Sequence, residues 1–254
     1  MKTSLAFVAP IVALGAAAPQ KRDETSTCEY YKGFETPGYG VGNWVEENYV
    51  PETAEQCLTL DSYTDESVSY HANFTYSPAA DWMVGFPNAG VKGLERARLE
   101  DHESIPTSWD WSMQGTDVTA SVNYVLNGNS NCINDFPTWS MSIWLGTFGG
   151  LEPNDSTGKT GDLVDTVDMA GVAFDVYRIP DPSGWPLVMW VFQARENQTS
   201  FSGDLVEFLK WVGENESVAL GCLWYLAAGA DIYGGTGGTF TTSEFSAKQI
   251  LASA

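Results

Sequence analysis

The sequence is poor in histidine and in positive charge. It contains 2 histidines, and its 12 lysines and arginines stand against 33 aspartates and glutamates, so the formal net charge is −21. With two histidines and no GxSxG turn, a serine-hydrolase triad has little support. No spacing of cysteine and histidine suits a zinc site. A surface this acidic repels nucleic acid and anionic membranes, so we expect neither as a partner.

A phosphate-binding loop is missing as well. The glycine-rich run at 234–238 lacks the lysine and the following helix that such a loop needs, and it is more typical of a hairpin turn. We expect His71 and His102 to be structural or exposed. The sequence therefore predicts neither a metal nor a cofactor.

Long hydrophobic runs are absent too, and the sequence predicts no transmembrane segment. The apolar stretch at 5–14 is short, it follows the positive charge of Lys2, and alanines at 16–18 supply small residues for a signal peptidase. Lys21 and Arg22 resemble a dibasic processing site, although a flexible tail that ends in this pair by chance is the alternative. We therefore expect a secreted, extracellular protein in two parts, a signal peptide with a short pro-segment over 1–22 and a single domain over 23–254.

Cysteines are few, but their number is even. Four cysteines in an exported chain predict two disulfides, and sequence alone allows three pairings. Four Asn-X-Ser/Thr sequons support export, because such sites are glycosylated in secreted proteins. The predicted glycosylation sites are Asn73, Asn154, Asn197 and Asn215.

Aromatic residues are abundant, with 10 Trp, 11 Tyr and 12 Phe in 254 residues. Aromatic side chains favour strands and also stack on sugar rings. Apolar residues often alternate with period two, which predicts strands. Along 139–146, Ser140, Ser142 and Trp144 fall on the face opposite the apolar one. Strands are expected over 118–126, 139–146, 172–177, 187–194, 223–228 and 238–242.

One segment instead has helical periodicity. The apolar residues of 202–212 recur three and four positions apart. Ser202 is the expected N-cap, Asp204 lies in the first turn, where the helix dipole favours it, and Gly213 is the expected end. Many strands with a single amphipathic helix predict one all-β sandwich, whose helix covers part of one sheet.

Seven features in chain order resemble one known family. Six segments are similar to sequence motifs of that family: 86–89 to YPN, 105–111 to IPSxWxW, 124–127 to YDLF, 139–145 to YEIMIWL, 201–208 to FSxDLxDF and 228–235 to AGTEPFxG. The seventh feature is the pair Cys28 and Cys57, which occupies the positions of the family's N-terminal disulfide. The family is glycoside hydrolase family 12, the endo-β-1,4-glucanases and xyloglucanases, and the resemblance spans about residues 28–250.

The resemblance implies a fold and a substrate. It implies a jelly roll of two curved antiparallel sheets, of the concanavalin-like glucanase type, with a β-1,4-glucan such as cellulose or xyloglucan lying across the concave face. We expect a monomer. The resemblance favours the pairing of Cys28 with Cys57. It also favours Cys132 with Cys222 near the cleft rim, with two buried free thiols as the alternative.

Three catalytic positions of that family are substituted here. By resemblance, its nucleophilic glutamate falls at Ser140, its acid/base glutamate at Asp231, and the aspartate beside the nucleophile at Val125. Retaining hydrolysis needs one carboxylate to attack the sugar and another to protonate the leaving oxygen. A serine hydroxyl is not ionised near neutral pH, and aspartate is shorter than glutamate by one bond of about 1.5 Å. The resemblance therefore implies that hydrolysis is lost or weak.

The same resemblance indicates which residues would bind the substrate. Trp144, Tyr124, Ser142 and Asn43 would line the cleft, with core packing as the alternative for Trp144. Glu152, in the loop after Trp144, would either approach the cleft or stay in solvent.

Three hypotheses for the function follow. The leading one is a secreted family-12-like protein that binds or acts on β-1,4-glucan with lost or weak hydrolysis. The second is an active endoglucanase or xyloglucanase with rearranged acids. The third is a non-catalytic interaction protein, a decoy for proteinaceous glucanase inhibitors or receptors.

Overall fold

A computed structural model describes residues 20–133, 136–155, 158–180, 187–216 and 218–252 of the chain. Strands dominate this part of the molecule, and it contains a single α-helix. The strands are β1 (Gln20–Thr27), β2 (Lys32–Glu35), β3 (Tyr39–Val45), β4 (Thr53–Tyr63), β5 (Val68–Ser77), β6 (Gly85–Val91), β7 (Ala97–Arg98), β8 (His102–Ser104), β9 (Pro106–Asn129), β10 (Trp139–Phe148), β11 (Asp162–Met169), β12 (Val172–Pro180), β13 (Val188–Ala194), β14 (Ser200–Asp204), β15 (Cys222–Ala247) and β16 (Ile250–Leu251). The helix is α1 (Leu205–Asn215), and two 3₁₀ turns are η1 (Glu47–Tyr49) and η2 (Leu99–Asp101).

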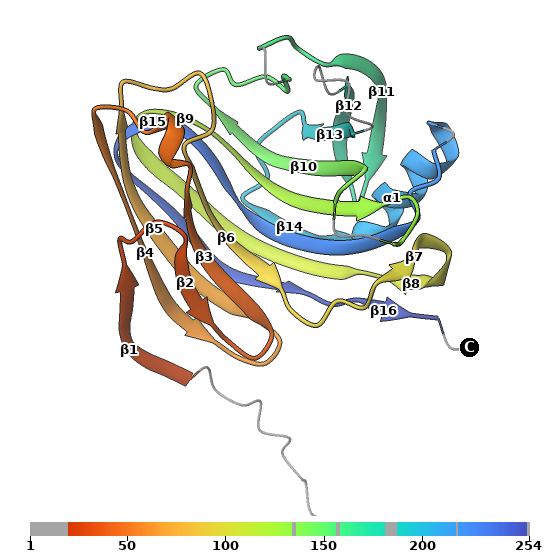
Figure 1. Ribbon diagram of the computed structural model, residues 1–254, viewed down its shortest axis with the longest axis horizontal. Coiled ribbons are helices and arrows are strands. Elements are labelled where there is room, and N and C mark those ends of the chain that lie inside the picture. Colours follow the sequence, from red (N-terminus) through yellow and green to blue (C-terminus); the bar gives the residue numbers. More distant parts are fainter. Residues whose placement is uncertain (1–19, 134–135, 156–157, 181–186, 217, 253–254) are drawn as a thin grey trace, which may run out of the picture.

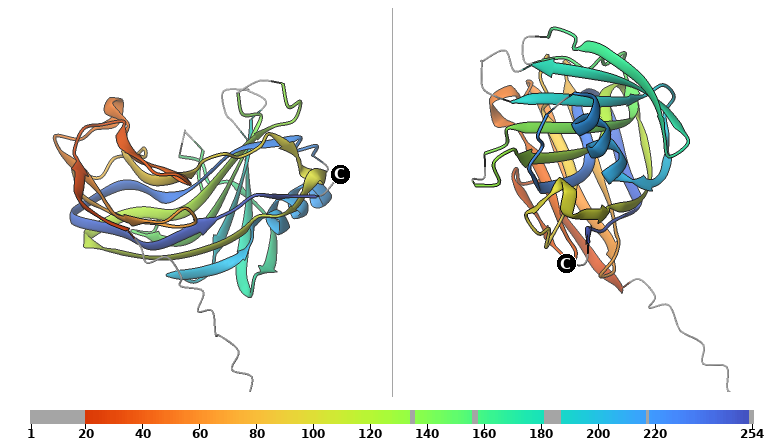
Figure 2. Two further views of the ribbon diagram at one scale, coloured as in Figure 1. Left: turned by 90° about the horizontal axis from the view of Figure 1, so that it is seen from below. Right: turned by 90° about the vertical axis from the view of Figure 1, so that its right-hand side faces the viewer.

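Two long strands, β9 and β15, run side by side across the molecule and belong to both of its layers (Figure 1). The outer layer has the order β1-β4-β5-β15-β9-β14, and the inner layer has the order β2-β3-β6-β15-β9-β10-β13-β12-β11. The strands are bent rather than flat (Figure 2), as expected of a jelly roll. The jelly-roll prediction is therefore confirmed, and β9 and β15 are longer than the strands predicted from alternation.

The glycine-rich run at 234–238 lies inside β15, so the expectation of a hairpin turn there is wrong. The ladder between β15 and β9 shifts register repeatedly between Ile232 and Thr239. Gly235 and Gly237 have φ values of 145° and 57°, a region that side chains disfavour. These glycines let the strand bend as it passes from one layer to the other.

The core lies between the two layers and follows the alternation read from sequence. On β9 the residues Val122, Tyr124 and Leu126 are fully buried, and on β10 Met141 and Ile143 are too. Their neighbours along each strand therefore point to the opposite, concave face of the inner layer. That face is where the candidate site is found.

The helix begins two residues later than predicted. Ser202 lies in β14, and Asp204 is the N-cap, accepting hydrogen bonds from the backbone amides of Val206 at 3.0 Å and Ile105 at 2.7 Å. The helix also continues through Gly213 instead of ending there. The ring of Phe208 packs edge-on against rings from β12 and β13, so α1 covers the inner sheet away from the concave face. No helix in the described ranges is long and apolar enough to span a membrane.

Both predicted disulfides form. Cys28 pairs with Cys57, and Cys132 pairs with Cys222. The second bond joins the loop before β10 to the start of β15, and it closes a loop between residues 90 positions apart. The alternative of free thiols at Cys132 and Cys222 is thereby excluded.

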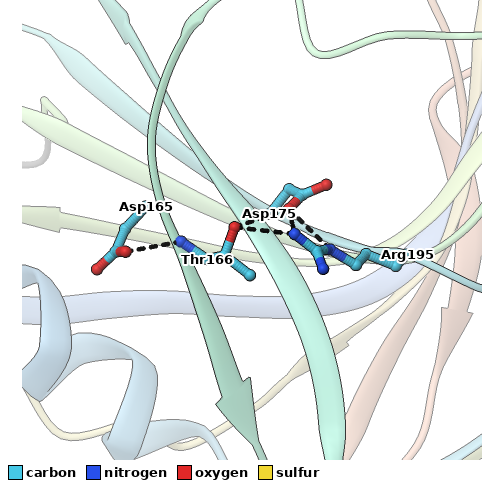
Figure 3. Close-up of polar contacts among 4 residues, drawn as sticks. All are labelled: Asp165, Thr166, Asp175 and Arg195. Atoms are coloured by element: carbon cyan, nitrogen blue, oxygen red, sulfur yellow. Dashed lines mark hydrogen bonds and ion pairs between the residues drawn. The ribbon is translucent and has the colours of Figure 1, made fainter.

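A polar cluster ties the edge strand β11 to the inner sheet (Figure 3). The guanidinium of Arg195 donates to Asp175 Oδ1 at 2.7 and 2.9 Å and to the hydroxyl of Thr166 on β11 at 3.0 Å. Asp165 accepts from the backbone amide of Thr166. The hydrogen bonds from Arg195 hold the pKa of Asp175 below its usual value.

Candidate functional site

The concave face of the inner sheet carries the substituted positions on three neighbouring strands. Ser140 on β10 faces Asn127 of β9 and Met189 of β13. Asp231 on β15 faces Ser121 of β9. The site is therefore a floor of short polar side chains, with β9 between the two positions that should carry the catalytic acids.

Asp231 is the acid of this floor. Its Oδ2 accepts hydrogen bonds from Asn123 at 2.7 Å and from the Ser121 hydroxyl at 3.4 Å. Burial raises the pKa of Asp231 to about 6, and these hydrogen bonds only partly oppose the shift. No second carboxylate is among the groups that act on it in the described chain. Asp231 can therefore hold or release a proton in mildly acidic surroundings, but no described residue gives it a partner acid.

Among the described residues, the strand neighbours of Ser140 include no group that could activate it. Its neighbours on the adjacent strands, Asn127 and Met189, are not bases. None of the side-chain hydrogen bonds found among the described residues involves its hydroxyl. Nucleophilic serines are activated by an adjacent general base, so this serine is not equipped to attack a sugar.

The residue at the position of the family's assisting aspartate, beside the nucleophile position Ser140, is apolar. Val125 lies between Ser142 of β10 and Ala227 of β15. The three side chains form a neutral strip between Ser140 and Asp231. Nothing in this strip adds a charge that would help to separate the pKa values of an acid and a base.

Trp144 lies on the concave face but is covered. Its side chain is 6% exposed and packs in a small apolar cluster with Ile179 and Val191, against which Leu151 and Tyr177 also pack. The alternation that put Trp144 opposite the core is confirmed. The ring of Trp144 is not open for stacking on a sugar, because Leu151 of the loop after β10 packs against its cluster.

Two residues expected in the cleft lie elsewhere. Tyr124 is fully buried between the layers, and its hydroxyl is hydrogen bonded to Thr107. Asn43 is also fully buried. Its side-chain nitrogen donates a hydrogen bond to the backbone carbonyl of Gln56, and its side-chain oxygen accepts one from the Gln56 side chain. Both point to the core side of their strands, so neither can line the concave face in this structure.

An exposed tryptophan that sequence reasoning missed stands beside Asn43. Trp44 is 47% exposed, and its ring meets Tyr31 edge-on with centroids 5.0 Å apart. Val41 and Val45 flank it in the core, so alternation alone assigns Trp44 to the concave face. A second exposed pair, Tyr49 and Trp82, lies with ring centroids 5.7 Å apart.

The second aromatic pair lies near the strand that carries Asp231. The amide of Val84, close behind Trp82, donates to the carbonyl of Ile232. The backbone amide of Glu46, just before the 3₁₀ turn that holds Tyr49, donates to the carbonyl of Val84. Exposed aromatic rings of this kind suit the apolar faces of sugars.

Glu152 does not reach Asp231. Its carboxylate is exposed and accepts from the Thr160 hydroxyl of its own loop at 3.1 Å, and its charge acts on Tyr177. The described residues with metal-like geometry, Cys28, Glu55 and Cys57, include a disulfide and so have no free thiolates. The residues present do not form a convincing metal site.

The sequons remain predictions. Asn73, Asn197 and Asn215 are exposed and Asn154 is half-buried. The side chain of Asn197 exchanges hydrogen bonds with the backbone of Thr147. Ser156 and Ser217, the third residues of two of the sequons, lie outside the described residues.

A curved jelly roll with an acid on its concave floor and aromatic rings beside it defines a polysaccharide-hydrolase type of scaffold. A family model described as glycosyl hydrolase family 12 matches residues 39–249. The chain belongs to this family.

Similar proteins agree with that assignment. The xyloglucan-specific endo-beta-1,4-glucanase A of Emericella nidulans is 30% identical over 204 residues, which cover 80% of this chain and 81% of that one. A probable enzyme of the same name from Aspergillus flavus is 29% identical over 94% of this chain and 98% of its own. Among solved structures, the catalytic domain of Humicola grisea Cel12A superposes with a TM-score of 0.78 at 22% identity, covering 89% of this chain and 99% of that one.

Proposed function

We propose that this protein is a secreted, glucan-binding member of its family that has lost most or all hydrolysis. The ligand would be a β-1,4-glucan, and xyloglucan is favoured because the relatives at 29–30% identity are called xyloglucan-specific. Removal of 1–22 would shorten β1, which starts at Gln20 and pairs with β4. Its remaining residues, such as Thr25 and Thr27, keep their pairing with β4.

The observation that carries the proposal is the neutral surrounding of Ser140. A retaining mechanism needs two carboxyls about 5–5.5 Å apart, and an inverting one needs them about 6.5–9.5 Å apart. Asp231 supplies one carboxyl, but Ser140, Ser142 and Val125 supply none. The exposed rings of Trp44 and Tyr31 support sugar binding without chemistry.

Calorimetric titration with xyloglucan, barley β-glucan and carboxymethyl cellulose tests binding, and a reducing-sugar assay on the same samples tests hydrolysis. We expect saturable binding of at least one glucan and no reducing sugar above the background of heated protein. Absence of any glucan binding would favour a decoy that meets proteinaceous glucanase inhibitors or receptors. A pull-down with such inhibitors tests that case directly.

A further inference from the structure

Asn123, a buried polar residue of β9, is not explained by core packing. Its side chain is fully buried, and its amide oxygen has no hydrogen-bond partner among the described residues. A buried acceptor without a donor destabilises a fold, and an apolar side chain of similar size would avoid the penalty. The amide is therefore better explained by what its nitrogen does.

That nitrogen serves the Asp231 carboxyl. Asn123 Nδ2 lies 2.7 Å from Asp231 Oδ2 and 2.9 Å from the Ser121 hydroxyl, which is itself 3.4 Å from the same Oδ2. The three side chains form a closed ring of hydrogen bonds on adjacent strands β9 and β15. All donors converge on Oδ2, and within the described structure Oδ1 accepts no hydrogen bond.

We propose that Asn123 is a positioning residue for Asp231, whose amide holds Oδ2 so that Oδ1 carries the proton and meets the sugar. The unengaged oxygen is the one with a free lone pair for a proton, while Oδ2 already accepts two hydrogen bonds. The meeting with a sugar rests on the proposed function, because it assumes that a glucan reaches Asp231. Asn123 itself acts from below, since its side chain is buried.

Few other groups can set the proton affinity of Asp231. On its own strand, Tyr225 and Tyr233 keep their protons, because burial and the charge of Asp231 raise the pKa of each hydroxyl. β9 contributes only Ser121 and Asn123. The loop before β6, whose backbone bonds β15, carries the exposed Asp81. A substitution of Asn123 should therefore change the pKa of Asp231 directly, and a titration of Asp231 measures that change.

The test is the pKa of Asp231 in the free, full-length protein, followed by carbon-13 NMR of the aspartate carboxyls, with Asp231→Asn assigning the signal. Loss of a charge-assisted hydrogen bond in Asn123→Leu is expected to raise this pKa by about 1 to 2. The matched control is Asn127→Leu, on the same face of β9 but opposite Ser140 and Tyr225, and it should leave the titration unchanged. Asn123→Ala is measured in the same way. If one of the two variants at position 123 does not fold, the other still gives the pKa of Asp231.

An Asp231 pKa that is unchanged in the folded variants at position 123 would overturn the positioning role. This measurement needs no glucan, so it is independent of whether the proposed function holds. A glucan titration of the wild-type protein gives the second arm. Binding together with an unmoved pKa refutes the role of Asn123 alone, whereas a raised pKa without any binding refutes the glucan ligand alone.

Discussion

Ser140 and Asp231 lie on opposite sides of β9, and the residues that they face there, Asn127 and Ser121, are six positions apart. At about 3.3 Å per residue, roughly 20 Å of strand separates the two levels. Glycosidase carboxyls need to approach within about 10 Å of each other. The side chains of serine and aspartate are both too short to close this separation.

Restoring length and charge at both positions should not restore hydrolysis on this backbone. Glutamate is longer than aspartate by only one bond of about 1.5 Å, whereas roughly 20 Å of strand separates the two levels. We therefore expect Ser140→Glu combined with Asp231→Glu to release no more reducing sugar from xyloglucan than the matched control, Ser140→Gln combined with Asp231→Glu. Reducing-sugar assays on both double variants compare them. A release at least about a hundredfold higher from the variant with two glutamates would contradict this separation, because only well-placed catalytic groups give such a gain.

The Asp231 carboxyl should destabilise the fold at neutral pH. Its pKa of about 6 in the folded protein is above the ordinary value of 3.8, so the folded state binds the proton more tightly. Its contribution to stability is therefore fully present below pH 3.8 and is lost as the pH rises through 6. A shift of this size corresponds to up to about 3 kcal/mol.

Replacement of Asp231 by asparagine should accordingly stabilise the protein at pH 7, by up to about 3 kcal/mol. Urea unfolding at pH 4 and pH 7 measures the difference, and the gain should largely vanish at pH 4. Asp175→Asn is the contrasting control, because the Arg195 hydrogen bonds lower the pKa of Asp175 and its removal should not stabilise. A gain for Asp231→Asn that is equal at both pH values would refute the linkage.

Trp44 should contribute to glucan binding by stacking. We expect Trp44→Ala to weaken xyloglucan affinity about 3- to 10-fold, the loss of one aromatic contact of about 0.5–1.5 kcal/mol. Titration calorimetry measures it. Ile250→Ala, which truncates an exposed side chain on β16, is the control and should bind like wild type. Unchanged affinity in Trp44→Ala would remove Trp44 from the binding surface.

The bond between Cys132 and Cys222 should stabilise the fold more than the other disulfide does. It joins residues 90 positions apart, whereas Cys28 and Cys57 are 29 apart, and longer closed loops restrict the unfolded chain more. Replacing the pair Cys132 and Cys222 by serines should cost about 2–5 kcal/mol. Denaturant unfolding of both double variants compares them, and a larger loss for the pair at 28 and 57 would contradict the expectation.

Alternation predicted strand segments within β9, β10, β12, β13 and β15 and the face on which Trp144 and Ser140 lie, because the period of two is fixed by strand geometry. It predicted none of the strands before β9. It did not reveal how far β9 and β15 extend, because the bends at Gly235 and Gly237 look like turns in the sequence. The predicted start of the helix at Ser202 was wrong, because β14 continues to Asp204. Asp204 is the N-cap because its carboxylate accepts hydrogen bonds from the backbone amides of Val206 and Ile105.

The binding residues were less predictable than the fold. Motif resemblance favoured Tyr124 and Asn43, but their burial depends on which side of each strand meets the other layer. Trp44 could have been found from the alternation of Val41 and Val45 around it. The packing of Leu151 against the Trp144 cluster could not have been predicted from the sequence, because the path of a loop leaves no periodic pattern.

The most direct test is the chain length of xyloglucan after long incubation with an equimolar amount of wild-type protein, measured by size-exclusion chromatography beside a binding isotherm. The account predicts saturable binding with no shortening of the polymer. Shortening that disappears in Asp231→Asn would contradict it, because Asp231 would then work with a second acid outside the Ser140 position.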